Sequence, residues 1–74
     1  MGEAADLGER LWRARRRHHH VDAVVRAQSA AYELLFFHDD RLIVTWPFAD
    51  RDGAVAEAAA RLRELQRAGW NVHW

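Results

Sequence analysis

Hydrophobic and polar residues alternate along one stretch of the chain, and an alternation of period two predicts a β-strand. Over residues 19–27, Val21, Ala23 and Val25 alternate with Asp22, Val24 and Arg26. Residues 31–37 and 41–48 are dense in the aromatic and β-branched side chains that favour strands. The sequence therefore predicts three strands, and the short connections between them favour an antiparallel meander.

A helical period follows the third predicted strand. Asp50 is a good N-cap residue, and the pattern continues to Ala68. Gly69 fits the position just past a helix, and we expect Trp70 to fold back onto Leu65. The expected apolar stripe is Val55, Ala58, Ala59, Leu62 and Leu65, and the expected solvent face is Glu57, Arg61, Arg63, Glu64 and Arg67.

The N-terminal residues suggest a second, shorter helix. Over residues 3–17, apolar positions recur at helical spacing, namely Ala4, Leu7, Leu11 and Ala14. We therefore expect an α+β protein: residues 1–17 form a basic, partly helical arm, and residues 18–74 form a βββα domain. This domain is a three-stranded antiparallel β-meander with one long amphipathic helix packed on one face.

The turn between the second and third predicted strands sets which side chains share a face. A three-residue loop, His38-Asp39-Asp40 with Asp40 left-handed, separates apolar from mixed positions best. One face then carries Tyr32, Leu34, Phe36, Leu42, Val44 and Trp46, which we expect the helix to cover. The other face carries Glu33, Leu35, Phe37, Arg41, Ile43 and Thr45.

The second face has an apolar centre that one helix cannot cover, since the helix occupies the first face. We expect Arg26 and Glu33 to pair across strands beside this centre. Either the N-terminal arm folds over it, or two copies stack face to face. The second alternative predicts a homodimer, or a complex with another protein, through Val24, Leu35, Phe37 and Ile43.

Composition restricts the class of protein. The 74 residues allow one domain, and no cysteine is present to form a disulfide or a thiolate ligand. No apolar run approaches the roughly 20 residues of a membrane span, and residues 1–6 lack a signal-peptide pattern. We therefore expect a soluble, cytoplasmic protein with no membrane partner. All 11 basic residues are arginine, which is typical of a bacterial genome of high GC content.

A net charge of zero conceals a basic stretch. Residues 10–17 carry five arginines and no acid, residues 1–9 three acids, and residues 18–74 six arginines against eight acids, giving +5, −3 and −2. Cations beside an aromatic side chain suggest nucleic-acid binding. The residues of this alternative are Trp12, Arg13, Arg15, Arg16 and Arg17. A pI near 7.0 favours instead a basic segment that pairs with the acids of the domain.

Consecutive histidines at positions 18–20 raise a metal-binding alternative. In a strand, His18, His20 and Asp22 would project to one face, and His38 or His73 could join them. A solvated polar stretch explains the same residues. No nucleophile elbow, phosphate loop or catalytic triad order is present. We therefore expect no enzyme activity and no cofactor.

Short motifs carry two resemblances. Leu11-Trp12-Arg13, Val21-Asp22-Ala23, Tyr32-Glu33-Leu34, Trp46-Pro47 and Ala68-Gly69-Trp70 resemble short, uncharacterised bacterial proteins built as strand–strand–strand–helix. That resemblance implies the fold and no activity. Trp46-Pro47-Phe48 before a helix is also similar to antitoxin domains of the HicB type. This chain differs from them because it has no Pro-Gly loop. This second resemblance implies a partner-binding, antitoxin-like domain.

Overall fold

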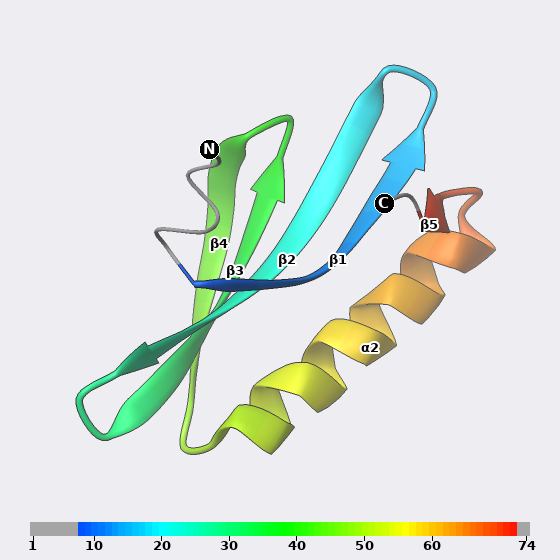
Figure 1. Cartoon of the computed structure of the whole chain (residues 1–74). Helices are drawn as coiled ribbons and strands as arrows, with labels where there is room; N and C mark the ends of the chain where they lie inside the picture. Colours follow the sequence, from blue (N-terminus) through cyan, green and yellow to red (C-terminus); the bar gives the residue numbers. More distant parts are fainter. Residues whose placement is uncertain (1–7, 73–74) are drawn as a thin grey trace.

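The computed structural model describes residues 8–72, which form one antiparallel sheet with a helix across one face (Figure 1). Four strands follow one another as hairpins and are followed by the helix and a short fifth strand. They are β1 (Glu9–Arg16), β2 (His19–Gln28), β3 (Ala31–His38), β4 (Arg41–Phe48), α2 (Arg51–Arg67) and β5 (Asn71–Val72). The order across the sheet is β4-β3-β2-β1-β5, so β4 lies at one edge and β5 at the other.

The predicted three-stranded sheet and helical arm are wrong, although the three predicted strands correspond to β2, β3 and β4. Residues 9–16 of the expected arm form β1, which pairs with β2, and residues 1–7 lie outside the described part. Leu11 is an extra residue between the pairs Arg10–Val24 and Trp12–Ala23, that is, a β-bulge. The bulge interrupts the period-two alternation, and the remaining apolar positions imitate a helical spacing.

The β3–β4 turn also differs from the prediction. It has two residues, Asp39 and Asp40, both left-handed with φ values of 52° and 69°, as the mirror-image hairpin turns require. Phe37 pairs with Leu42, and Phe36 pairs with Val44, so Ile43 is the extra residue of a second bulge. Therefore Leu42 does not share the helix-covered face with Phe36 as expected, and Ile43 does not share the opposite face with Phe37.

The core lies between the sheet and α2. Its buried members come from both layers: Trp12, Ala14, Ala23, Val25, Leu34, Phe36, Ala54 and Ala58. The helix presents small buried residues to the sheet, with Leu62 and Leu65 packed at the margin. The line of closest contact thus runs through Ala54 and Ala58, while Val55 and Ala59 of the expected stripe are half-buried.

Both predicted helix ends are confirmed. The Asp50 carboxylate accepts a hydrogen bond from the amide of Gly53 at 2.8 Å. At the other end Gly69 has φ of 100°, its amide donates to Gln66, and the Trp70 amide donates to Leu65. This pattern is a Schellman motif. No helix in the described part has both the length and the apolar character needed to cross a bilayer.

Candidate functional site

The four residues predicted for self-association do not form one exposed patch. Val24 and Leu35 pair across β2 and β3 and are 0% and 2% exposed in a single copy. Phe37 is half-buried on the same side of β3. Ile43 is 56% exposed, but the bulge places it beside the residues of the helix-covered face. These positions do not test whether the protein dimerises. Val24 and Leu35 are, however, too buried to contribute much contact area to a partner.

Two cross-strand ion pairs flank Val24 on that side of the sheet. Arg26 of β2 pairs with Glu33 of β3, as the sequence predicts. Arg13 of β1 donates two hydrogen bonds to the nearly buried Asp22 of β2, at 2.6 and 2.9 Å. The hydrogen bond to Asp22 raises the pKa of the Arg13 guanidinium above its ordinary value. The negative charge of Asp22 is thus already balanced by the guanidinium of Arg13, which donates to both carboxylate oxygens.

An apolar groove lies on the other side, between β4 and the C-terminal half of α2. Its volume is about 320 Å³, and its walls are Val21, Phe36, Ile43, Val44, Trp46, Arg61 and Leu65. The guanidinium of Arg61 lies 4.7 Å from the Trp46 ring centroid and also pairs with Glu57. The one charged wall residue is therefore held against an aromatic ring, and the rest of the groove is apolar.

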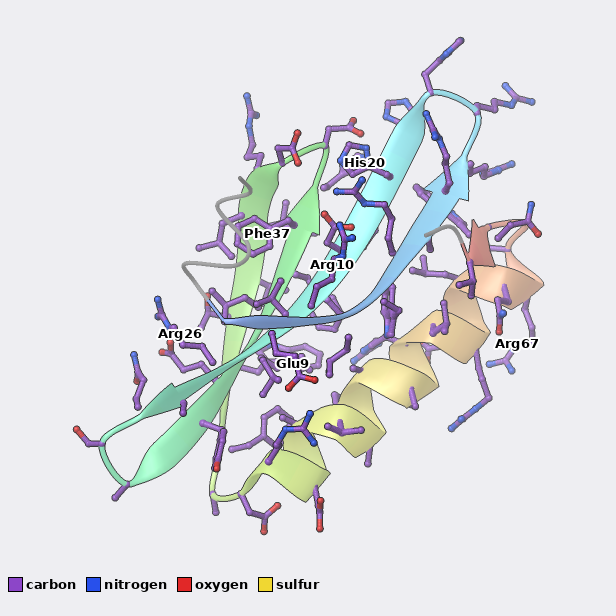
Figure 2. All side chains as sticks on the ribbon, in the orientation of Figure 1. Glu9, Arg10, His20, Arg26, Phe37 and Arg67 are labelled. Carbon is purple, nitrogen blue, oxygen red and sulfur yellow. The ribbon has the colours of Figure 1, made fainter. Side chains whose placement is uncertain are left out.

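The course of the helix explains why this groove is open. The helix begins next to the end of β4 and runs obliquely to β5 at the opposite edge (Figure 1). Its N-terminal turn is joined to the start of β1 by an ion pair of Arg51 with Glu9 at 2.6 Å. Figure 2 labels Glu9 at this end of β1. Ile43, near the start of β4, consequently stays uncovered and is 56% exposed, whereas Leu42, 49% exposed, lies on the opposite face of the sheet.

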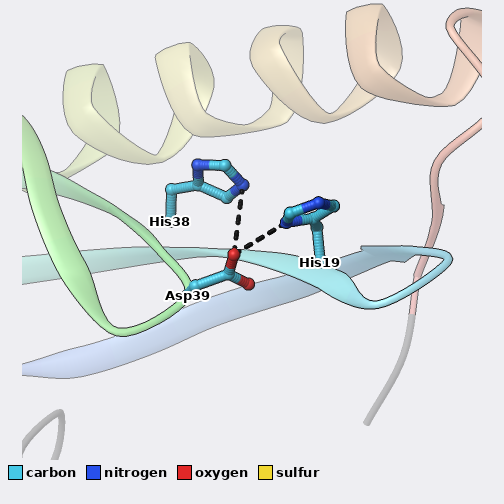
Figure 3. A group of neighbouring side chains, drawn as sticks. All are labelled: His19, His38 and Asp39. Carbon is cyan, nitrogen blue, oxygen red and sulfur yellow. Dashed lines mark hydrogen bonds and ion pairs between the residues drawn. The ribbon is translucent and has the colours of Figure 1, made fainter.

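A second feature gathers histidines and aspartates at the turn end of β2 and β3. The register pairs Val21 with His38, which brings the start of β2 beside the Asp39-Asp40 turn. His19 Nδ1 lies 2.7 Å from Asp39 Oδ2, and His38 Nε2 lies 3.5 Å from the same oxygen (Figure 3). The amide of His20 donates to Asp39 Oδ1 at 3.0 Å. The hydrogen bond with His19, helped by that amide, lowers the pKa of the Asp39 carboxyl to about 2.

The predicted metal set is only partly brought together. His20 and Asp22 group with Asp40, and His38 groups with His19 and Asp39. His18 lies in the turn before β2 and belongs to neither group. His73 is outside the described residues. Sequence alternation places His18 and His20 on one face, but the strand begins only at His19, and Asp39 and Asp40 become neighbours only through the pairing of β2 with β3.

The predicted nucleic-acid residues separate into buried and exposed members. Trp12 is in the core, where its indole nitrogen donates to the Ala58 carbonyl at 2.9 Å, so stacking on a base would require it to leave that position. Arg13 is held by Asp22. The remaining arginines line two adjoining hollows. The first, of about 510 Å³, is lined by Arg15, Arg16, Arg17, Gly69, Asn71 and Val72. The second, of about 260 Å³, is lined by Arg16, Arg17, His19 and Trp70.

Trp70 therefore occupies the aromatic position that the sequence analysis gave to Trp12. Only the turn of the chain after α2 places it beside the arginines, so local sequence patterns contain no signal for it.

Comparisons of the chain with protein families, curated proteins and solved structures gave no match.

Proposed function

We propose that the protein is a small, non-catalytic interaction domain that forms a homodimer through β4 and the apolar groove beside it. The observation that supports this most is the 56% exposure of Ile43, a wall residue of the groove, on the edge strand β4. Edge strands have unpaired backbone groups that can pair with another strand. Small domains with little core gain most from covering such surfaces.

A second copy of the chain is the occupant that these features favour. The same edge on another copy pairs with β4 antiparallel about a twofold axis, which is the commonest oligomer symmetry. The net charge of zero means that two copies do not repel one another overall. This interface retains Ile43 from the sequence-based prediction and replaces Val24, Leu35 and Phe37 with the groove residues. A cytoplasmic location, expected from the sequence, is compatible with the proposal.

Light scattering coupled to gel filtration tests the proposal. We expect a mass that rises from one chain of 8.6 kDa toward two as the concentration increases from about 10 to about 500 µM. Ile43→Arg should keep the protein monomeric because it places an unpaired charge in the interface. Val72→Arg is the matched control, since Val72 is 40% exposed on the opposite edge strand.

Two outcomes would contradict the proposed dimer. One is a monomeric wild-type protein over the whole concentration range. The other is an Ile43→Arg variant that still dimerises while Val72→Arg does not, which would move the interface to β5. A stable heterologous complex with a monomeric chain would support a different protein partner, including an antitoxin-like role, instead of self-association.

A nucleic-acid function is the second candidate, and the hollow formed by Arg16, Arg17 and Trp70 favours it. Arginines contact phosphates, and the ring of a tryptophan that lines the same hollow can stack on an unpaired base. A single-stranded oligonucleotide should quench tryptophan fluorescence in low salt, and an Arg16→Ala, Arg17→Ala double variant should abolish the effect. No gel retardation at low ionic strength would remove this candidate.

A further inference from the structure

The histidine and aspartate side chains at the turn end of the sheet converge from separate segments of the chain. His19 comes from the start of β2, His38 from the end of β3, and Asp39 from the turn that follows (Figure 3). One ligand atom from each of the three lies within 4.8 Å of the others. The two histidine nitrogens lie 2.7 and 3.5 Å from Asp39 Oδ2.

We propose that His19, His38 and Asp39 bind a divalent transition-metal ion, with zinc as the preferred ion. Imidazole nitrogens and a carboxylate oxygen are a common zinc ligand set, with bonds of about 2.0–2.2 Å. Tetrahedral ligands at that bond length are roughly 3.3 Å apart. The 3.5 Å separation of His38 from Asp39 is close to this value. The 2.7 Å hydrogen bond between His19 and Asp39 is shorter, and side-chain rotations that lengthen it would open a position for the ion.

Backbone contacts hold Asp39 in the orientation that such a site needs. Its Oδ1 accepts the amide of His20 at 3.0 Å, and its own amide donates to the carbonyl of His20 at 2.9 Å. Oδ2 is the atom directed at both imidazoles. The ring of His38 has further support, because it packs edge-on against Trp70 at 6.4 Å between centroids.

The neighbouring group of His20, Asp22 and Asp40 is a weaker candidate. Arg13 already occupies both oxygens of Asp22, so a cation there would have to displace a bidentate guanidinium. The carboxylate of Asp39, in contrast, accepts no hydrogen bond from an arginine among the described residues. This difference selects the first group as the metal site.

The site has three protein ligands, and this sets its properties. Three ligands leave a coordination position for water or an added ligand. The side chain of His19 is 57% exposed, so the ion would be open to solvent. Arg16 and Arg17 line the hollow next to His19 and oppose a cation. We therefore expect an affinity weaker than that of closed four-ligand structural zinc sites.

Isothermal titration calorimetry with zinc chloride, in a buffer that does not chelate metals, tests the site on the whole chain. We expect one ion per chain. His38→Ala should weaken binding by at least about 100-fold, more than the roughly 10–100-fold loss caused by changing outer-shell partners. His18→Ala is the matched control, since this neighbouring histidine belongs to neither group. Its affinity should stay within about twofold of the wild type.

A second variant and a spectroscopic measurement separate metal binding from folding. Asp39→Asn keeps a residue type that tolerates the left-handed conformation, and it removes the charge. It should retain the far-UV circular dichroism spectrum of the wild type and lose the visible absorption of bound cobalt(II). Unchanged binding in His38→Ala, equal losses in His18→Ala, or loss in His20→Ala alone would each overturn the assignment to His19, His38 and Asp39.

Discussion

The contact between Trp12 and the helix leads to a quantitative prediction about stability. Trp12 is 5% exposed, packs against Phe36 at 6.1 Å between ring centroids, and donates its indole hydrogen to the Ala58 carbonyl. It therefore joins β1, a strand near the edge of the sheet, to the middle of α2. Trp12→Phe keeps an aromatic ring in place while removing the donor and part of the ring volume.

The expected destabilisation follows from these two losses. Ala58 is in mid-helix, so its carbonyl keeps its helical partner, and the lost hydrogen bond costs about 1 kcal/mol. The space left by the smaller ring costs about 1 kcal/mol more. The free energy of unfolding should thus fall by about 2 kcal/mol, against a total of about 4–11 kcal/mol for a domain of this size. Trp12→Ala should cost about 3–5 kcal/mol, a large part of that total.

Urea denaturation followed by far-UV circular dichroism measures the effect. With a slope of about 1 kcal/mol per molar urea, the midpoint of Trp12→Phe should fall by about 2 M. All variants should be compared at one protein concentration, because the proposed dimerisation would make the midpoint concentration-dependent. Trp70→Phe is the control, since Trp70 is half-buried and makes no indole hydrogen bond in the described part. If Trp12→Phe shifts the midpoint no more than Trp70→Phe, the proposed role of the Trp12 contact is wrong.

Two further substitutions test local features of the sheet. Arg13→Ala should lower the free energy of unfolding by about 2 kcal/mol, because it leaves the nearly buried Asp22 carboxylate without its donors; equal stability in a urea titration would refute this. Gly8→Ala should lower the melting temperature more than Gly69→Ala, because the added carbon at position 8 would clash with a backbone carbonyl of β2. At Gly69 the nearest atom is an arginine nitrogen 3.5 Å away. The reverse order of melting temperatures in calorimetry would contradict this.

The elements that the sequence predicts correctly are those with a regular period, a high density of strand-favouring residues or a defined cap. The strands β2, β3 and β4 alternate regularly or consist of β-branched and aromatic residues, and α2 has Asp50 and Gly69 at its ends. β1 was missed because Leu11 breaks its alternation and its inward-facing apolar residues are few. β5 has only two residues, too few for a periodic signal.

The candidate sites are harder to predict because they depend on register. Placing Ile43 in the groove requires knowledge of a bulge that shifts its side chain relative to Phe37. The metal-ligand group requires that the start of β2 pair with the end of β3. Local periodicity predicts the strands but not these pairings, which depend on the packing of the whole sheet. The sequence therefore indicates histidine as a ligand type, but it does not identify His19 as one of the three residues of the proposed site.

The geometry of β4 restricts how the proposed dimer can be held together. Pro47 lacks an amide hydrogen, and the bulge at Ile43 interrupts regular pairing near the other end of the strand. Val44–Trp46 is left as the stretch suited to a ladder with a second copy, and so short a ladder makes few hydrogen bonds. Burial of Ile43 and the other apolar groove residues against the partner must then supply most of the association free energy. Because apolar burial responds weakly to salt while phosphate binding is strongly salt-dependent, high salt should preserve the dimer and abolish any nucleic-acid complex.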